Sequence, residues 1–300
     1  MRAIPGPRRA DAPPMPEGDS RDWLRHPGAE VLPRVSSTPC HARRVTARLQ
    51  AGTTLLDAVS AAVEAAVADG GADGGADGAC AILDGVALAG MAYVMPDGPP
   101  DDRHAAWYSE TCTARNVTLD RATAPVGRRD GAWFLHCHAM WNGGMGHLLN
   151  DRCILAADCE VTLWLTQGAR LEVAPDPETG FPLFAPRAMA AVTGANAATV
   201  TVRPHEDLHA ALEAACATAG LIDADLHGIG SLIGAGFHDA PPMSAPMSEV
   251  LLLPGCRLEA GRIGALPVAC VDPWGTIHQG HLRRGAGPVC VTFEVLAVGR

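Results

Sequence analysis

Lysine is absent from this sequence of 300 residues, so all 23 basic residues are arginines. This absence excludes Schiff-base chemistry on a lysine and a phosphate-binding loop that ends in lysine. The 33 acidic residues outnumber the arginines and give a formal net charge of −10. An acidic chain has no long-range attraction for a phosphate backbone, so nucleic acid is not an expected partner.

Long apolar runs are also missing, and the first residues contain no apolar segment of the signal-peptide type. We therefore expect no membrane partner and a cytoplasmic location. The 10 cysteines are scattered without a single Cys-x-x-Cys pair, which favours reduced core residues over a disulfide framework. Hydrophobic residues make up 48% of the chain, enough for the cores of about two domains.

Three histidines lie close together in the sequence, at His136, His138 and His147. Successive side chains of a β-strand point to opposite faces, so His136 and His138 are expected on one face. Asn142 and Gly143 are typical of a tight hairpin turn, because both residue types tolerate positive φ. Folding the chain about this turn brings His147 beside His138, and the three imidazoles are predicted to converge.

Three imidazole ligands leave one position of a tetrahedral metal open for water or substrate. The spacing therefore predicts a site for a divalent metal, with zinc as the expected ion. The alternative is that these histidines are ordinary half-buried side chains of the fold. Cys137 lies between two of them and should point to the opposite face, as a small buried hydrophobic residue.

The chain also repeats itself. A strand followed by a helix is predicted over residues 45–60 and again over 200–213, with Arg48 and Arg203 at matching places. Further along, Gly-His-Leu is followed by Glu-Val in both copies, and the spacing from His147 to Glu160 equals that from His281 to Glu294. The match at both ends predicts duplication of one domain.

The repeat suggests four parts. We expect a disordered tail rich in proline and arginine over residues 1–38, a first domain over 39–174, a linker over 175–197 and a second domain over 198–300. The first copy carries an Asp/Gly-rich insert over residues 69–78. Its units contain no strand-forming position, which predicts a flexible loop and not a calcium site.

The order His-x-His, glycine-rich hairpin, Gly-His-Leu and then Glu-Val resembles the plants-and-prokaryotes conserved domain, the PPC or PCC domain. The second-copy segment over residues 248–255 fits the same pattern. The resemblance covers roughly residues 40–174 and 198–300 and implies an α/β (α+β-like) fold. It implies two tandem PPC-like domains, each a mainly antiparallel sheet packed with one or two helices.

The resemblance also implies a homo-oligomer with the trimer-type packing of domains common in this family. Some prokaryotic members hold zinc with histidines of this motif, which map onto His136, His138 and His147 here. The family is often labelled DNA-binding, so a transcriptional regulator is an alternative function. That label belongs to plant relatives that carry an Arg-Gly-Arg-Pro segment, which this sequence lacks.

The second copy departs from the histidine motif. Aligning its turn at Trp274 and Gly275 with the first turn places Val268 and Cys270 at the His-x-His positions. An ungapped count back from His281 instead places Cys270 and Asp272 there. We predict that this copy has lost the metal and serves as a structural partner, with Cys270, Asp272 and His281 as its remaining possible ligands and His278 nearby.

The function expected from these features is an oligomeric module that binds a metal and a small molecule. The alternative is a metal-dependent enzyme in which zinc activates a water molecule. Glu160 is the candidate catalytic or orienting carboxylate, ahead of Glu110, because a glutamate recurs at its position in the second copy. A structural role for Glu160, such as pairing with Arg48, is equally open.

Overall fold

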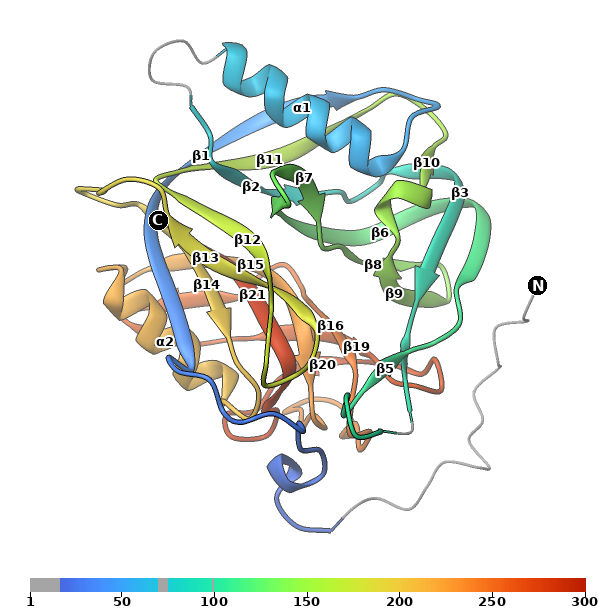
Figure 1. Ribbon diagram of the computed structural model, residues 1–300, viewed down its shortest axis with the longest axis vertical. Coiled ribbons are helices and arrows are strands. Elements are labelled where there is room, and N and C mark those ends of the chain that lie inside the picture. Colours follow the sequence, from blue (N-terminus) through green and yellow to red (C-terminus); the bar gives the residue numbers. More distant parts are fainter. Residues whose placement is uncertain (1–16, 70–74, 99) are drawn as a thin grey trace.

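Antiparallel strands dominate the fold. The structure, a computed structural model, describes residues 17–69, 75–98 and 100–300 (Figure 1). The strands with residues mainly of the first half are β1 (Val35–Leu49), β2 (Gly78–Ile82), β3 (Ala87–Val94), β4 (Pro96–Asp97), β5 (Trp107–Tyr108), β6 (Cys112–Arg129), β7 (Ala132–Leu135), β8 (His138–Trp141), β9 (Gly144–Leu148), β10 (Ile154–Leu155), β11 (Cys159–Gln167), β12 (Ala169–Pro175) and β13 (Pro182–Ala188). Those of the second half are β14 (Ala197–Val202), β15 (Ala224–Leu232), β16 (Glu249–Leu252), β17 (Arg257–Glu259), β18 (Arg262–Ile263), β19 (Pro267–Val271), β20 (Ile277–His281) and β21 (Val289–Gly299).

Two α-helices occur in the described residues, α1 (Leu55–Asp69) and α2 (Leu208–Thr218), with short 3-10 turns η1 (Ser20–Asp22) and η3 (Asn150–Arg152). Side chains cap both helix starts. The Thr54 hydroxyl accepts the Asp57 N–H at 3.0 Å, and the Asp207 carboxylate accepts the Ala210 N–H at 2.9 Å. Each helix covers the outer side of its own half (Figure 1). The predicted strand–helix units are confirmed.

The two halves share one strand order, which supports the duplication. In the first half the neighbours run β1, β11, β2, β6, β8 and β9, all antiparallel. In the second they run β14, β21, β15, β16, β19 and β20, also antiparallel. The mainly antiparallel α+β fold that the sequence predicts is therefore present. No helix in the described parts of the chain is long and apolar enough to cross a membrane.

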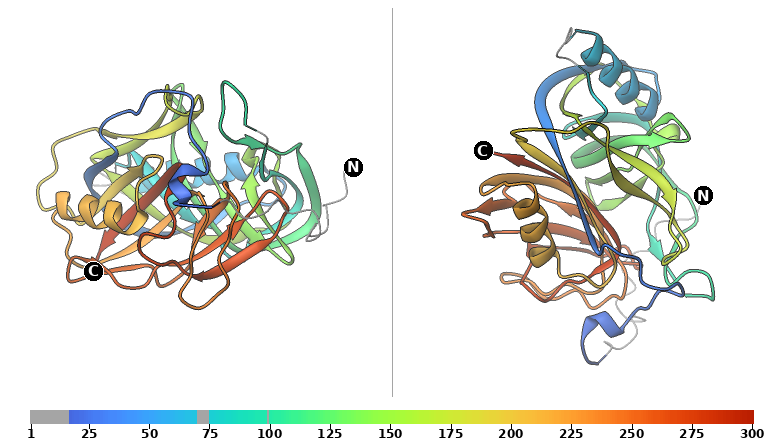
Figure 2. Two further views of the ribbon diagram at one scale, coloured as in Figure 1. Left: turned by 90° about the horizontal axis from the view of Figure 1, so that it is seen from below. Right: turned by 60° about the vertical axis from the view of Figure 1, so that its left-hand side comes forward.

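The halves are joined by a strand and by shared cores. Residues 35–40 of β1 pair with β14, and residues 41–49 pair with β11, so that β1 runs along both sheets (Figures 1 and 2). The core of the first half also takes in four buried side chains of the second, namely Ile229, Leu251, Ala269 and Val271. Two such units cannot separate without exposing apolar surface to water.

The tail prediction is wrong for residues 17–38, while residues 1–16 lie outside the described residues. Leu24 is 4% exposed and packs against Ile233 and Met247. The Arg34 guanidinium donates to both carboxylate oxygens of Glu178 at 2.7 and 2.9 Å. These contacts order a segment whose sequence has no hydrophobic periodicity. The predicted linker contains β13, which pairs with β12, and part of the predicted Asp/Gly loop, residues 70–74, lies outside the described residues.

Candidate metal centre at the junction of the halves

The histidine hairpin has the predicted register. In the β8–β9 pair His138 lies opposite His147 and Trp141 lies opposite Gly144, with Asn142 and Gly143 as the turn. Gly143 has a φ of 77°, which glycine adopts without steric cost. The Trp141 ring packs edge-on against Tyr93, with centroids 4.7 Å apart, and anchors the hairpin in the first core.

The three imidazoles meet at one point. One nitrogen from each of His136, His138 and His147 lies within 4.8 Å of the other two, and this is the only such group found among the described residues. His138 is fully buried, whereas the side chain of His136 is 13% exposed. Cys137 points away into the core, where burial raises the pKa of its thiol. The predicted convergence is confirmed, and the group could hold a metal ion.

Each imidazole makes its Nδ1 contact to a separate partner. Nδ1 of His136 donates to Glu294 Oε2 at 2.7 Å, and Nδ1 of His138 donates to the Val250 carbonyl at 2.8 Å. Nδ1 of His147 lies 3.3 Å from the Tyr108 hydroxyl. Metal-binding histidines commonly use one ring nitrogen in this way while the other faces the ion. Here Nε2 of His136 and Nε2 of His138 approach to 3.1 Å, so both nitrogens face a common point.

Two glutamates of the second half complete the site, and sequence reasoning did not identify either of them. Glu294 of β21 is 1% exposed beside His136, and Glu249 of β16 lies 2.6 Å from Nε2 of His138. The signal for Glu294 was its recurrence at the position of Glu160 in the repeat. For Glu249 the only signal was the match of its segment to the resembled family.

Glu160 is not at this site, and its candidate role is corrected. It is exposed on β11 and lies opposite Arg48 in the strand pair. Glu160 and Glu294 occupy the corresponding strands of the two halves, but only β21 has this stretch turned toward the other half. Glu110 is also exposed and does not line the cavity at the histidines.

Electrostatics differ among the three histidines. Burial opposes the charged form of His136, but the carboxylates of Glu294 and Glu249 outweigh it and raise the pKa of this imidazole. Burial and the neighbouring imidazoles of His136 and His138 lower the pKa of His147 well below its usual value. A ring held neutral has a free lone pair, which is the form that binds metals.

The possible ligands of the second copy lie apart. His281 lies opposite Pro267 in the β19–β20 pair, so neither sequence alignment gave the structural register. Cys270 is buried in the second core, and the Asp272 carboxylate accepts hydrogen bonds from the loop at Trp274 and from His278. His281 is exposed and its Nδ1 bonds to Asp239 at 2.6 Å. These three residues form no cluster like that of the first copy.

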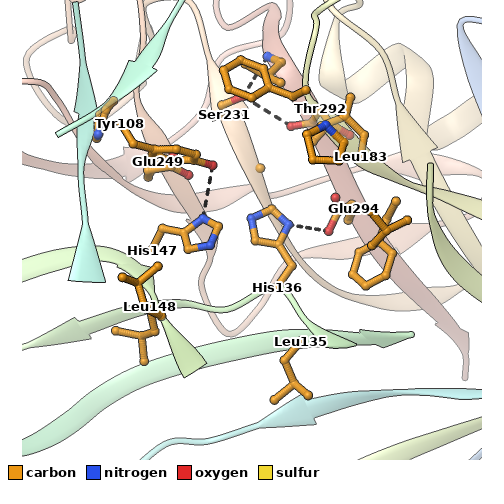
Figure 3. A pocket seen from close by; sticks show the side chains of 18 of the residues that line it. Tyr108, Leu135, His136, His147, Leu148, Leu183, Ser231, Glu249, Thr292 and Glu294 are labelled. Carbon is orange, nitrogen blue, oxygen red and sulfur yellow. Dashed lines mark hydrogen bonds and ion pairs between the residues drawn. The ribbon is translucent and has the colours of Figure 1, made fainter. Parts of the chain in front are cut away.

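A cavity of about 490 Å³ opens on the histidines from between the halves. His136 and His147 form part of its lining together with Glu249 and Glu294 (Figure 3). Much of the remaining wall is apolar and comes from β5, β7, β13 and neighbouring segments, with Trp107, Phe134, Phe181, Leu183 and Phe184. The volume lies in the range of small-molecule sites.

No family model and no curated protein matches the sequence. Solved structures do. A plant- and prokaryote-conserved (PPC) protein from Pyrococcus horikoshii is similar at 17% identity and a TM-score of 0.34. The match covers 52% of this chain and 97% of the Pyrococcus chain. A metal-containing protein from Archaeoglobus fulgidus is similar at 20% identity and a TM-score of 0.34. This match covers 48% of the present chain and 93% of the Archaeoglobus chain.

A protein from Ralstonia eutropha, described as a suspected DNA-binding protein, is similar at 18% identity and a TM-score of 0.32. It covers 47% of this chain and 89% of its own. The PPC resemblance in the motifs is thus accompanied by structural neighbours that include a PPC protein, each spanning about half of the chain.

Proposed function

We propose that this protein is a metal-binding module that holds a divalent ion, zinc in the first instance, at His136, His138 and His147 and binds a small molecule beside it. The observation that supports this most directly is the set of Nδ1 contacts. Each imidazole is oriented through Nδ1 by a partner outside the cluster, which leaves Nε2 to face an ion. At His138 the Glu249 carboxylate also approaches this nitrogen, at 2.6 Å. Two of the three partners belong to the second half, so the degenerate copy orients the ligands of the first.

The donor set fits zinc. Imidazole nitrogen suits Zn²⁺, and three protein ligands are typical of zinc sites with an exchangeable position. When bound, the ion would leave one position for water or substrate and lower the pKa of that water to about 7. The resemblance also implies a homo-oligomer, which light scattering on the purified chain would measure.

A second candidate, a metal-dependent hydrolase, is favoured by Glu249. Its carboxylate is buried, lies 2.6 Å from Nε2 of His138 and lines the cavity. A carboxylate in this position can accept a proton from a group at the centre. The alternative without catalysis assigns Glu249 to ion binding only. An E249Q variant that keeps its metal and loses turnover of an ester library would favour the enzyme.

The test of the main proposal is metal analysis by mass spectrometry of the purified full chain and of the H136A/H138A double variant. We expect about one equivalent of metal in the wild type and a small fraction of that in the variant. His281→Ala, at the matching position of the second copy, is the control and should keep the metal. Equal metal content in the wild type and the double variant would refute the site.

Circular dichroism and thermal unfolding of the same variants separate two roles of the ion. A double variant that folds without metal marks an open functional site, whereas an unfolded one marks a structural ion. The burial of His138 makes some loss of stability certain for its alanine form. H136A alone therefore serves as a milder variant, because this side chain is partly exposed.

A further inference from the structure

We propose that the cavity at the histidines takes an organic anion with an apolar body, whose carboxylate or similar group pairs with Arg129. This inference rests on the proposed function for the position of the metal but concerns a different end of the cavity. Arg129 is the only arginine in the cavity lining within the described residues. It is the last residue of β6, seven positions before His136, and this strand pairs with β7 and β8.

The wall next to Arg129 is aromatic. Its guanidinium stacks over the Phe134 ring, 4.5 Å from the centroid, and Phe134 packs edge-on against Phe184 at 5.6 Å. Phe181 and Leu183 also line the cavity, where the Phe181 ring packs against His104 and Tyr108. Such a surface favours an apolar or aromatic ligand body, and stacking fixes the plane of the guanidinium for a planar anion.

The Arg129 side chain has no acidic partner. Across the described parts of the chain, no ion pair or side-chain hydrogen bond of Arg129 occurs, although acidic residues outnumber basic ones in the sequence. Many other arginines of the described residues form an ion pair with a carboxylate, as Arg34 does with Glu178. Its neighbour Arg128 points to a different surface, stacks on Trp133 at 3.4 Å and does not line the cavity.

The other charges of the lining agree with this orientation. Glu249 and Glu294 lie at the histidine end, where an anion without a metal would be repelled. Asp151 is the third acidic residue of the lining. An anionic group is thus favoured at Arg129 and disfavoured at the carboxylates, which places the opposite end of the ligand toward the metal centre.

Calorimetric titration of the full chain tests this, with 4-phenylbutanoate and octanoate as probes and 4-phenylbutanamide as the uncharged match. We expect at least one carboxylate to bind, and 4-phenylbutanoate to bind about tenfold more tightly than its amide, the magnitude of one charge-assisted hydrogen bond. R129Q should abolish this preference and R128Q should keep it. Neither arginine forms an ion pair within the described residues, so both variants should fold.

A carboxylate can also bind a metal directly, so the titrations are repeated on the H136A/H138A variant. Our proposal requires the preference for the carboxylate to persist there and to depend on Arg129. A preference that survives R129Q but disappears without the histidines overturns it, as does equal binding of carboxylate and amide or no binding of any probe. The metal content of each sample is measured in parallel. Failure of the metal proposal therefore appears as absent metal, independently of the result at Arg129.

Discussion

Glu294 accepts a hydrogen bond from Nδ1 of His136 at 2.7 Å, across the junction of two halves that share one strand order. The glutamate comes from the copy whose own histidine pair is missing. Through this contact the second half orients a histidine of the first.

Glu294→Gln should weaken zinc binding by about 10- to 100-fold, because an amide orients the imidazole less strongly than a carboxylate and does not raise its basicity. Competition with a coloured chelator measures this affinity. Glu160→Gln is the matched control, since it changes the corresponding strand at an exposed position and should leave the affinity unchanged. An equal loss in both variants would show that the effect is not local.

Zinc should raise the melting temperature of the wild type, and chelation should lower it. A ligand at about 100 times its Kd stabilises a fold by roughly 2.7 kcal/mol. Because His138 and Val250 belong to different halves, we expect both halves to gain stability together. Scanning calorimetry with zinc and with chelator measures the shift. The H136A/H138A variant should show none, and a shift of the same size in that variant would place the ion elsewhere.

Acid should destabilise the junction at Arg34, Asp176, Glu178 and Arg203. Burial alone would raise the pKa of the Asp176 and Glu178 carboxyls, but hydrogen bonds outweigh it and the pKa of each is lowered. The donors are Thr179 and Arg203 for Asp176, and Arg34 and Val31 for Glu178. A depressed folded pKa stabilises the protein above the unfolded pKa. This stability is lost as the pH falls through the folded value.

Urea unfolding between neutral pH and the acid range below about pH 4 measures this dependence. Arg34→Ala should cost about 3 kcal/mol at neutral pH and much less in acid, because it removes the bidentate partner of a buried carboxylate. Glu178 would keep only the Val31 N–H at 3.1 Å and Arg203 at 3.3 Å. Arg25→Ala, which removes an exposed pair with Asp22, is the control and should change stability little. A constant cost of R34A at every pH would contradict this account.

Leu251→Ala should destabilise the whole chain by about 2–5 kcal/mol, because this second-half side chain is 1% exposed inside the first-half core. We expect a single unfolding transition that shifts as a whole. Ile222→Ala, at a side chain that is 65% exposed, should change stability by less than about 0.5 kcal/mol. Two separate transitions, with only the second half affected by L251A, would show that the shared core is not continuous.

Local sequence was sufficient for the histidine hairpin. Strand alternation placed His136 and His138 on one side, and the Asn142–Gly143 turn fixed the register that puts His147 opposite His138. In the second copy the same reasoning failed at His281, because its loop is longer and no short turn fixes the pairing. The disordered-tail prediction failed over residues 17–38 for a related reason, since Leu24 and Arg34 are ordered by partners far away in sequence.

The sequence by itself determined the repeated strand–helix units, the antiparallel character of the sheets and the convergence of three imidazoles, because each depends on spacing over a few residues. Tertiary structure alone decided which carboxylates reach them. Glu160 and Glu294 are alike in sequence context, but only Glu294 lies on a strand surface covered by the other half. Burial and a shared cavity arise from packing segments more than a hundred residues apart, and no local pattern encodes that contact.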